Sequence, residues 1–354
     1  MAFDARTEDF QRLGLRFASK LDAADPFGAV RSLTEFGQRY AQNRDSLPQT
    51  DADRAFHLVA RAAELIDYRL PFAEDNAAPG IIESARKLLV EAVALDPTCH
   101  DAHRMLAAAD NPSFEDYYRF LVDGAESVRT ASEVARDMVD LGDEDANEMG
   151  RSLAMRPYER WLASLAARAL ECGHYRKGVD AALRLLELDP EDQADVRYTL
   201  ALAYAKLEDA EGLAHLVRGD TCGKHPDNPW YALARMALAY KARDFDRARN
   251  EARTLLAGYP GAARTLARQD WLPDGVFSRI VVRPHSEDEL ILAVSESTVL
   301  LQEGCDSREK GALGSWVMAL PKVAVAKTDD DAETAASGAG KPASGGPSEE
   351  GGRA

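Results

Sequence analysis

Cysteine and histidine lie close together at three points of the chain, and these residue types are the preferred ligands of zinc. The groups are Cys99 with His100 and His103, Cys172 with His174, and Cys222 with His225. Structural zinc sites usually combine two pairs with Cys-x₂-Cys or His-x₃₋₅-His spacing, whereas these three groups fall in separate segments. We therefore expect no metal site. The four cysteines are too sparse for a disulfide framework, so we also expect free thiols.

Motifs for nucleophilic, phosphate or metal-assisted chemistry are missing from the sequence. No G-x-S-x-G elbow, no glycine-rich loop ending in Gly-Lys-Ser/Thr and no H-E-x-x-H helix is present. The sequence thus predicts no catalytic residues and no cofactor. An enzyme whose reactive groups come together from distant positions stays open as the alternative, because catalytic triads assemble in that way.

The charge balance argues against nucleic acid as a partner. Acidic side chains outnumber basic ones 60 to 43, and the formal net charge of −17 repels phosphate backbones. The N-terminus lacks a basic start followed by an apolar stretch, and no run of about 18 apolar residues occurs. We expect a cytoplasmic protein that does not enter a membrane.

The elements that would carry a site repeat along the chain. Small and large apolar residues followed by proline recur with the same intervals of four, three and five residues. The three sets are Ala85, Leu89, Ala92 and Pro97; Gly178, Ala182, Leu185 and Pro190; and Ala248, Ala252, Leu255 and Pro260. Pro190 and Pro260 are 70 residues apart, or two units of 35, which is the period of tetratricopeptide repeats. The pattern predicts an all-α fold, a tetratricopeptide-like α-solenoid of antiparallel helix pairs.

Five segments follow from this repeat grammar. We expect an N-terminal helical segment over residues 1–75, and the first helix pairs with an acidic connection over 76–150. Repeats continue over 151–265, and capping helices over 266–320 cover the exposed face of the last repeat. Residues 321–354 are rich in Gly, Ser, Ala and acidic side chains and predict a disordered acidic tail. Asp189 followed by Pro190 predicts the start of a helix at that point.

The run from Leu186 to Tyr198, LELDPEDQADVRY, resembles a helix junction of tetratricopeptide proteins related to the suppressor of tumorigenicity 7 family. Those proteins typically carry Asp-Asn where this chain has Asp192-Gln193. The segments Ser286–Glu289 and Gly311–Trp316 resemble the closing helices of that family, so the resemblance covers roughly residues 150 to 320. It implies helical repeats and transfers no catalytic residue.

The concave face of such repeats is the surface on which we expect a partner to bind. Counting from the repeat positions, basic and aromatic residues gather there on an otherwise acidic protein: Arg160, Tyr198, Lys206, Tyr231, Arg235 and Lys241. They would hold an extended or acidic peptide by charge-assisted hydrogen bonds and flat apolar contact. The alternative reading is that they are ordinary solvated helix residues.

The function expected is therefore a non-enzymatic adaptor or scaffold for a protein or peptide. In the alternative, a regulatory or enzymatic activity resides in the N-terminal helices and the repeats serve for docking. The acidic tail, with Asp329 to Asp331 and Glu333, is a further candidate as an occupant of the concave face.

Overall fold

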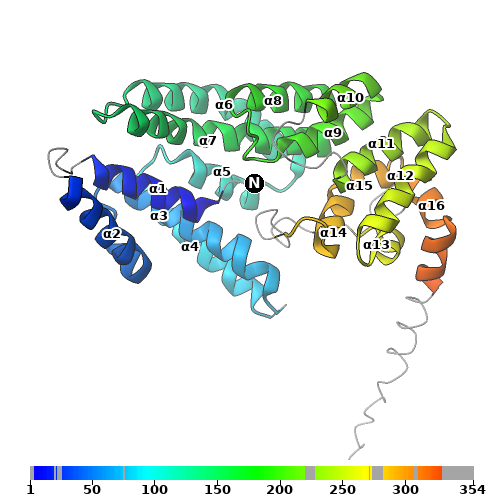
Figure 1. The fold of residues 1–354 in the computed structure, drawn as a ribbon, viewed down its shortest axis with the longest axis horizontal. Helices are drawn as coiled ribbons and strands as arrows, with labels where there is room; N and C mark the ends of the chain where they lie inside the picture. The colour runs from blue at the N-terminus through cyan, green and yellow to red at the C-terminus, as the bar shows by residue number, and fades with distance from the viewer. Residues whose placement is uncertain are drawn as a thin grey trace, which may run out of the picture.

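The computed structural model describes residues 4–328 apart from 20, 22–25, 75, 220–227, 271, 273–281 and 306–309. Within these residues all regular secondary structure is helical, which confirms the predicted all-α class (Figure 1). None of the helices in this described part combines the length and the apolar content needed to cross a membrane.

The helices follow one another through short connections. The N-terminal part contains α1 (Ala5–Ala18), α2 (Pro26–Asn43), a 3₁₀ turn (Arg44–Ser46), α3 (Asp51–Glu64), a π-helical turn (Leu65–Arg69), a 3₁₀ turn (Leu70–Phe72) and α4 (Ala78–Leu95). The middle contains α5 (His100–Asp110), α6 (Phe114–Asp137), α7 (Glu144–Glu171), α8 (Tyr175–Leu188), α9 (Val196–Leu207) and α10 (Ala210–Arg218). The C-terminal part contains α11 (Pro229–Lys241), α12 (Phe245–Gly258), α13 (Ala262–Arg268), α14 (Glu287–Glu296), α15 (Thr298–Leu301) and α16 (Ala312–Met318).

Helices that are neighbours in sequence pack together, and the repeated small and large apolar residues form their contacts. The pairs α3 with α4, α6 with α7, α7 with α8 and α11 with α12 share the most extensive packing. Ala92, Ala182 and Ala248 are each 0% exposed, and Leu185 and Leu255 are equally buried. Alanine at these positions lets the paired helices approach closely, so the spacing read from the sequence marks real helix contacts.

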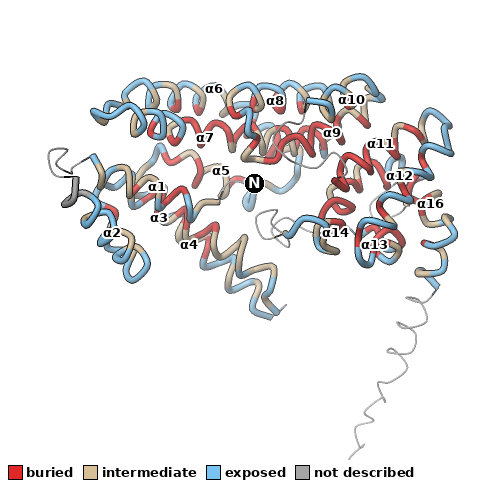
Figure 2. The backbone as a smooth tube through the Cα atoms, viewed as in Figure 1, coloured by how far each residue is buried: buried red, intermediate tan, exposed pale blue. Residues whose placement is uncertain are grey.

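Among the described residues, most of the buried apolar side chains fall into three clusters. Figure 2 shows the buried segments in red along the helices of the middle and C-terminal parts. One cluster joins α3, α4 and α5, a second joins α5 to α9, and the largest joins α9 with α11 to α16. The second and third share Val179, Tyr204 and Leu216 as partly buried neighbours, whereas the N-terminal cluster is separate from both. Between the N-terminal cluster and α7 lies a set of buried charged side chains, described below.

Two of the expected segment boundaries differ from the structure. α7 runs without interruption from Glu144 to Glu171, so the boundary expected at residue 150 falls inside a single helix. Its early turns pack against α6, and Trp161 lies so close to Gly124 that a Cβ there would be 2.5 Å from the indole ring. The close approach of α6 and α7 makes the acidic connection part of one unit rather than a linker.

The first residues of the expected disordered tail are helical. After a break at residues 319–320, residues 321–328 form another helical stretch, and Val323 is 0% exposed within the C-terminal cluster. The burial of the apolar Val323 accounts for this difference, because it offsets the entropy of ordering this stretch. The acidic residues of the tail, from Asp329 onward, lie outside the described residues, and so does any contact they make with the repeats.

Candidate functional site

Two of the six residues predicted to bind a peptide, Lys206 on α9 and Lys241 on α11, face the C-terminal part of the chain itself. The Lys206 ammonium group donates to the Val299 carbonyl oxygen at 3.1 Å and to the Glu303 carboxylate at 2.9 Å. Lys241 pairs with the same carboxylate at 3.0 Å. Burial acts to raise the pKa of Glu303, but the two lysines outweigh it and lower that pKa. Both cations therefore hold the segment that follows α15.

The predicted aromatic residues belong to the core. The Tyr198 ring stacks on Trp230 with centroids 4.2 Å apart and planes 7° from parallel, and Tyr231 is 0% exposed. The Trp230 indole nitrogen donates to the Glu296 carboxylate of α14 at 2.7 Å. α14 packs on α11, and α15 packs on α9 (Figure 1). The prediction that this face is open to a peptide is wrong for Tyr198 and Tyr231, because the chain's own helices cover it.

The remaining two predicted arginines are engaged within the fold. Arg235 donates to the Glu251 carboxylate of α12 at 3.0 Å, and its side chain is 19% exposed. Arg160 of α7 is buried further and lies between two carboxylates. It donates to both oxygens of Asp101 on α5, at 2.7 and 2.5 Å, and to Glu8 on α1 at 2.5 Å. These six residues do not form one surface.

The charged set around Arg160 ties the N-terminal helices to α7. Glu8 is 0% exposed and also accepts from Arg12 at 2.8 Å. Burial acts to raise the pKa of Glu8, but Arg160 and Arg12 outweigh it and lower that pKa. Burial opposes the arginines in the same way at Asp101, where they prevail and lower the pKa to about 2. Both carboxylates are thus held ionised in the interior.

Two of the three cysteine and histidine groups fall among the described residues. Cys99 is buried, and burial raises the pKa of its thiol to about 11. His174 lies against the Tyr118 ring, 4.4 Å between centroids, and pairs with Glu115 at 3.1 Å. The Cys222 and His225 pair lies outside the described residues. Among the residues that are described, no three metal-ligating side chains come together.

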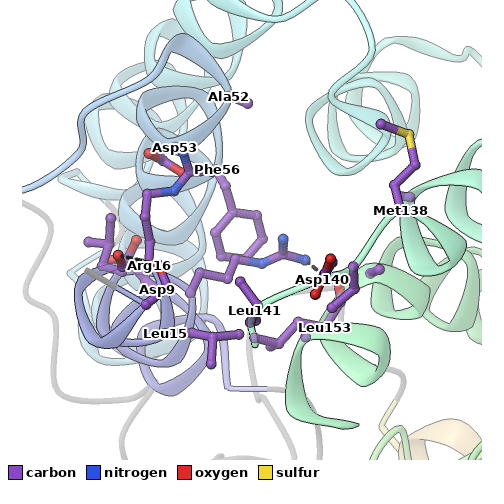
Figure 3. Close-up of a pocket in the computed structure, with 17 residues that line it drawn as sticks. Asp9, Leu15, Arg16, Ala52, Asp53, Phe56, Met138, Asp140, Leu141 and Leu153 are labelled. Atoms are coloured by element: carbon purple, nitrogen blue, oxygen red, sulfur yellow. Dashed lines mark hydrogen bonds and ion pairs between the residues drawn. The ribbon is translucent and has the colours of Figure 1, made fainter. Parts of the chain in front are cut away.

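A pocket that the sequence did not predict lies where α1 and α3 face the α6–α7 connection (Figure 3). Its volume is about 580 Å³, within the range of roughly 300 to 1,000 Å³ typical of binding pockets. The apolar part of the lining is Leu13, Leu15, Phe56, Ala135, Met138, Val139, Leu141, Leu153 and Ala154. We call this space the α1–α7 pocket.

The charged residues that line the α1–α7 pocket are mostly paired inside the protein. Arg12 lies 4.4 Å from the Phe56 ring centroid and donates to the Leu153 carbonyl oxygen at 2.7 Å, besides its bond to Glu8. Arg16 pairs with Asp53 at 3.1 Å. Asp9 of α1 is 1% exposed and faces the His57 imidazole at 2.9 Å. These pairs fix the walls, and the space is lined by both the paired charged groups and the apolar side chains.

Gly150 of α7 allows the wall opposite α1 to form. A Cβ at this position would lie 2.8 Å from Val139, which is closer than Cβ atoms approach other groups, and 3.2 Å from Leu141, which is a tight contact. The missing side chain lets the α6–α7 connection lie against α7, with Met138 left 77% exposed at the edge of the pocket. An exposed methionine beside an apolar pocket is typical of an adaptable binding surface.

Two features of the sequence bear on what was missed: the acidic α6–α7 connection for the pocket, and the apolar runs of α9 and α11 for the face that α14 and α15 cover. Acidic residues crowd the α6–α7 connection, but their position beside α1 depends on contacts across about 130 residues of chain. Four consecutive residues of α9, 200–203, and four of α11, 231–234, are each at most 1% exposed. Such helices, apolar on all sides in sequence, are typical of buried elements rather than of surface repeats.

Comparison with known proteins adds no family to this geometry. No family model, no curated protein and no solved structure matches the chain.

Proposed function

We propose that the protein is a non-enzymatic adaptor or scaffold that binds a protein or peptide partner in the α1–α7 pocket, on a tetratricopeptide-like α-solenoid of antiparallel helix pairs. The solenoid reading is supported by the repeated apolar spacing and by the packing of sequence neighbours. The resemblance to the suppressor of tumorigenicity 7 family agrees with such an architecture and stays a prediction.

The observation that carries the proposal is a pocket with an apolar part to its lining and an exposed apolar residue at its edge. Met138, 77% exposed, lies beside a lining of leucine, valine and phenylalanine side chains. A partner that covers these groups gains the free energy of apolar burial, about 25 cal/mol for each Å² removed from water. The face of α9 and α11, in contrast, already has an intramolecular occupant.

Catalysis is less well supported by the same pocket. Among the 17 residues that line it, Ser19 carries the only hydroxyl or thiol, and this hydroxyl donates to the Arg16 carbonyl oxygen at 3.0 Å. The lining cations and the Asp9 carboxylate have partners within the protein. The alternative of an activity in the N-terminal helices therefore stays a prediction without a reactive constellation to support it.

Site-specific photo-crosslinking tests the proposal. A photoreactive residue replaces Met138 in one version of the chain and Val90 of α4, which is 51% exposed, in another. Both versions are incubated with native lysate and irradiated. We expect discrete crosslinked proteins from position 138 that are competed by unlabelled chain and weakened by Leu141→Gln. Equal patterns from both positions would contradict binding in the pocket.

A further inference from the structure

The α6–α7 connection, which forms one wall of the α1–α7 pocket, carries excess negative charge. Between residues 136 and 151 the chain carries six carboxylates and two arginines. Arg136 pairs with Asp137, and Arg151 pairs with Glu144 at 3.1 Å. The other four, Asp140, Asp143, Asp145 and Glu148, are exposed, and Asp140 is part of the pocket lining.

Part of this acidity has a local role. Asp143 accepts from the Ala146 amide and caps α7, and acidic residues in a first turn are stabilised by the helix dipole. Asp140 precedes that helix, so capping does not account for its position in the pocket lining. Glu148 follows the first turn and lies about 160° around α7 from the pocket-lining Gly150, so it is on the far side of the helix. Their carboxylates add to the field of a chain whose formal net charge is −17.

The cations of the pocket do not offset this charge. Arg12 is bonded to Glu8 and Arg16 to Asp53, so each lining arginine has an acidic partner inside the wall. An acidic partner would meet the Asp140 carboxylate at the rim and arginines that already have acidic partners. A basic partner would meet the exposed Asp140 carboxylate beside apolar side chains.

We propose that the α1–α7 pocket takes a large apolar side chain from a cationic segment of a protein partner, with lysine or arginine next to that side chain pairing with Asp140. This inference rests on the proposed function and adds the chemistry of the partner. The apolar anchor supplies most of the affinity, and the Asp140 carboxylate supplies orientation and faster association.

A peptide selection on the full-length protein tests two things separately: that the pocket binds a peptide, and that the peptide is cationic. Random 12-residue peptides are displayed and enriched on the immobilised chain, and in parallel on the Met138→Gln variant and on its matched control Val90→Gln. We expect peptides that are enriched on the chain and on Val90→Gln but lost on Met138→Gln. These peptides should carry net positive charge and a leucine, phenylalanine or similar residue among their basic residues.

The outcomes distinguish the two proposals. Peptides that depend on Met138 but are neutral or acidic would overturn the cationic partner and leave the adaptor function standing. An absence of any Met138-dependent peptide would overturn both.

A charge reversal then measures the electrostatic part with one selected peptide in fluorescence anisotropy. Asp140→Lys should weaken binding at least tenfold at 50 mM salt, and the loss should shrink at 500 mM salt because exposed charges are screened. Glu91→Lys, the same charge change at an exposed position of α4, should alter binding less than twofold. Equal effects of the two reversals would contradict pairing at the pocket.

Discussion

Replacing Arg160 with methionine isolates the contribution of the buried charges that join α1, α5 and α7. Methionine keeps much of the aliphatic volume and removes the guanidinium group. The change leaves Glu8, 0% exposed, and Asp101, 3% exposed, without their main shared partner. Loss of one member of a buried ion pair costs about 3 to 5 kcal/mol, because the remaining charge stays desolvated.

The structure favours the lower end of that range. Glu8 keeps Arg12 at 2.8 Å and Arg156 at 3.5 Å, and Asp101 keeps Arg104 at 3.7 Å. We therefore expect Arg160→Met to lower the free energy of unfolding by about 3 kcal/mol at pH 7.

Equilibrium urea unfolding followed by circular dichroism measures the change. The matched control is Arg249→Met, which breaks an exposed pair with Asp246 and should cost less than about 1 kcal/mol. The pH dependence gives a second readout. The depressed pKa of Asp101, about 2, contributes stability that is present above pH 4 and lost as the pH falls toward 2. The difference in the free energy of unfolding between the unsubstituted protein and Arg160→Met should therefore become smaller below pH 4. Costs below about 1 kcal/mol for both variants would refute the assigned role of Arg160.

Three further predictions concern other parts of the fold. Burial and the nearby Asp189 raise the pKa of Glu159 to about 7, so the protein loses stability as the pH rises from 4.5 through 7. Measured by urea unfolding, the free energy of unfolding of Glu159→Gln relative to that of the unsubstituted chain should rise by on the order of 3 kcal/mol between pH 4.5 and 8. A difference that does not depend on pH would contradict this. Burial acts to lower the pKa of His57, but the Asp9 and Asp45 carboxylates outweigh it and raise that pKa, so its stabilisation is present at pH 6 and lost as the pH rises through the folded value. The fall in melting temperature caused by His57→Gln should therefore be larger at pH 6 than at pH 9, and an equal fall at both would argue against a charged imidazolium. Glu303→Gln removes the carboxylate shared by two lysines, so amide exchange of α15 should accelerate about fivefold, corresponding to roughly 1 kcal/mol; unchanged exchange would show that apolar packing alone holds α15.

The sequence was sufficient for helix contacts that depend on near neighbours. Ala182 and Leu185 lie on one side of their helix by simple periodicity, and both are 0% exposed as expected. The helical class and the contacts of the repeated residues follow from that period, because a helix face is defined by residues three and four positions apart.

Features set by distant segments were not predictable in the same way. The side of α11 that carries Tyr231 is buried by α14, some 60 residues later, and no local pattern specifies which end of the chain will fold onto it. The Arg160 site has the same origin, since its partners Glu8 and Asp101 are 152 and 59 residues away. A charged residue read as a surface group in sequence becomes an interior ion when separate helices supply its partners.

Local geometry also overrode one helix signal. Asp189 and Pro190 predicted a helix start, but α9 begins at Val196. The capping side chain is instead that of Asp192, two residues after the proline, whose backbone is in the left-handed region at φ 53°. Its carboxylate accepts from the Val196 and Arg197 amides at the start of α9. Asp189 and Asp192 both lie in the run from Leu186 to Tyr198, and the backbone conformation of the loop decides which of these two aspartates caps the helix.

The covered face of α9 and α11 bears on how this molecule deforms. A stack of helix pairs whose concave face is empty can bend by changing its curvature. Here Glu303 ties Lys206 of α9 to Lys241 of α11 across that inner side. We therefore expect the C-terminal part to stay rigid under mechanical load. Most of the deformation should occur between α1 and α7, where charged pairs rather than a continuous apolar core join the helices.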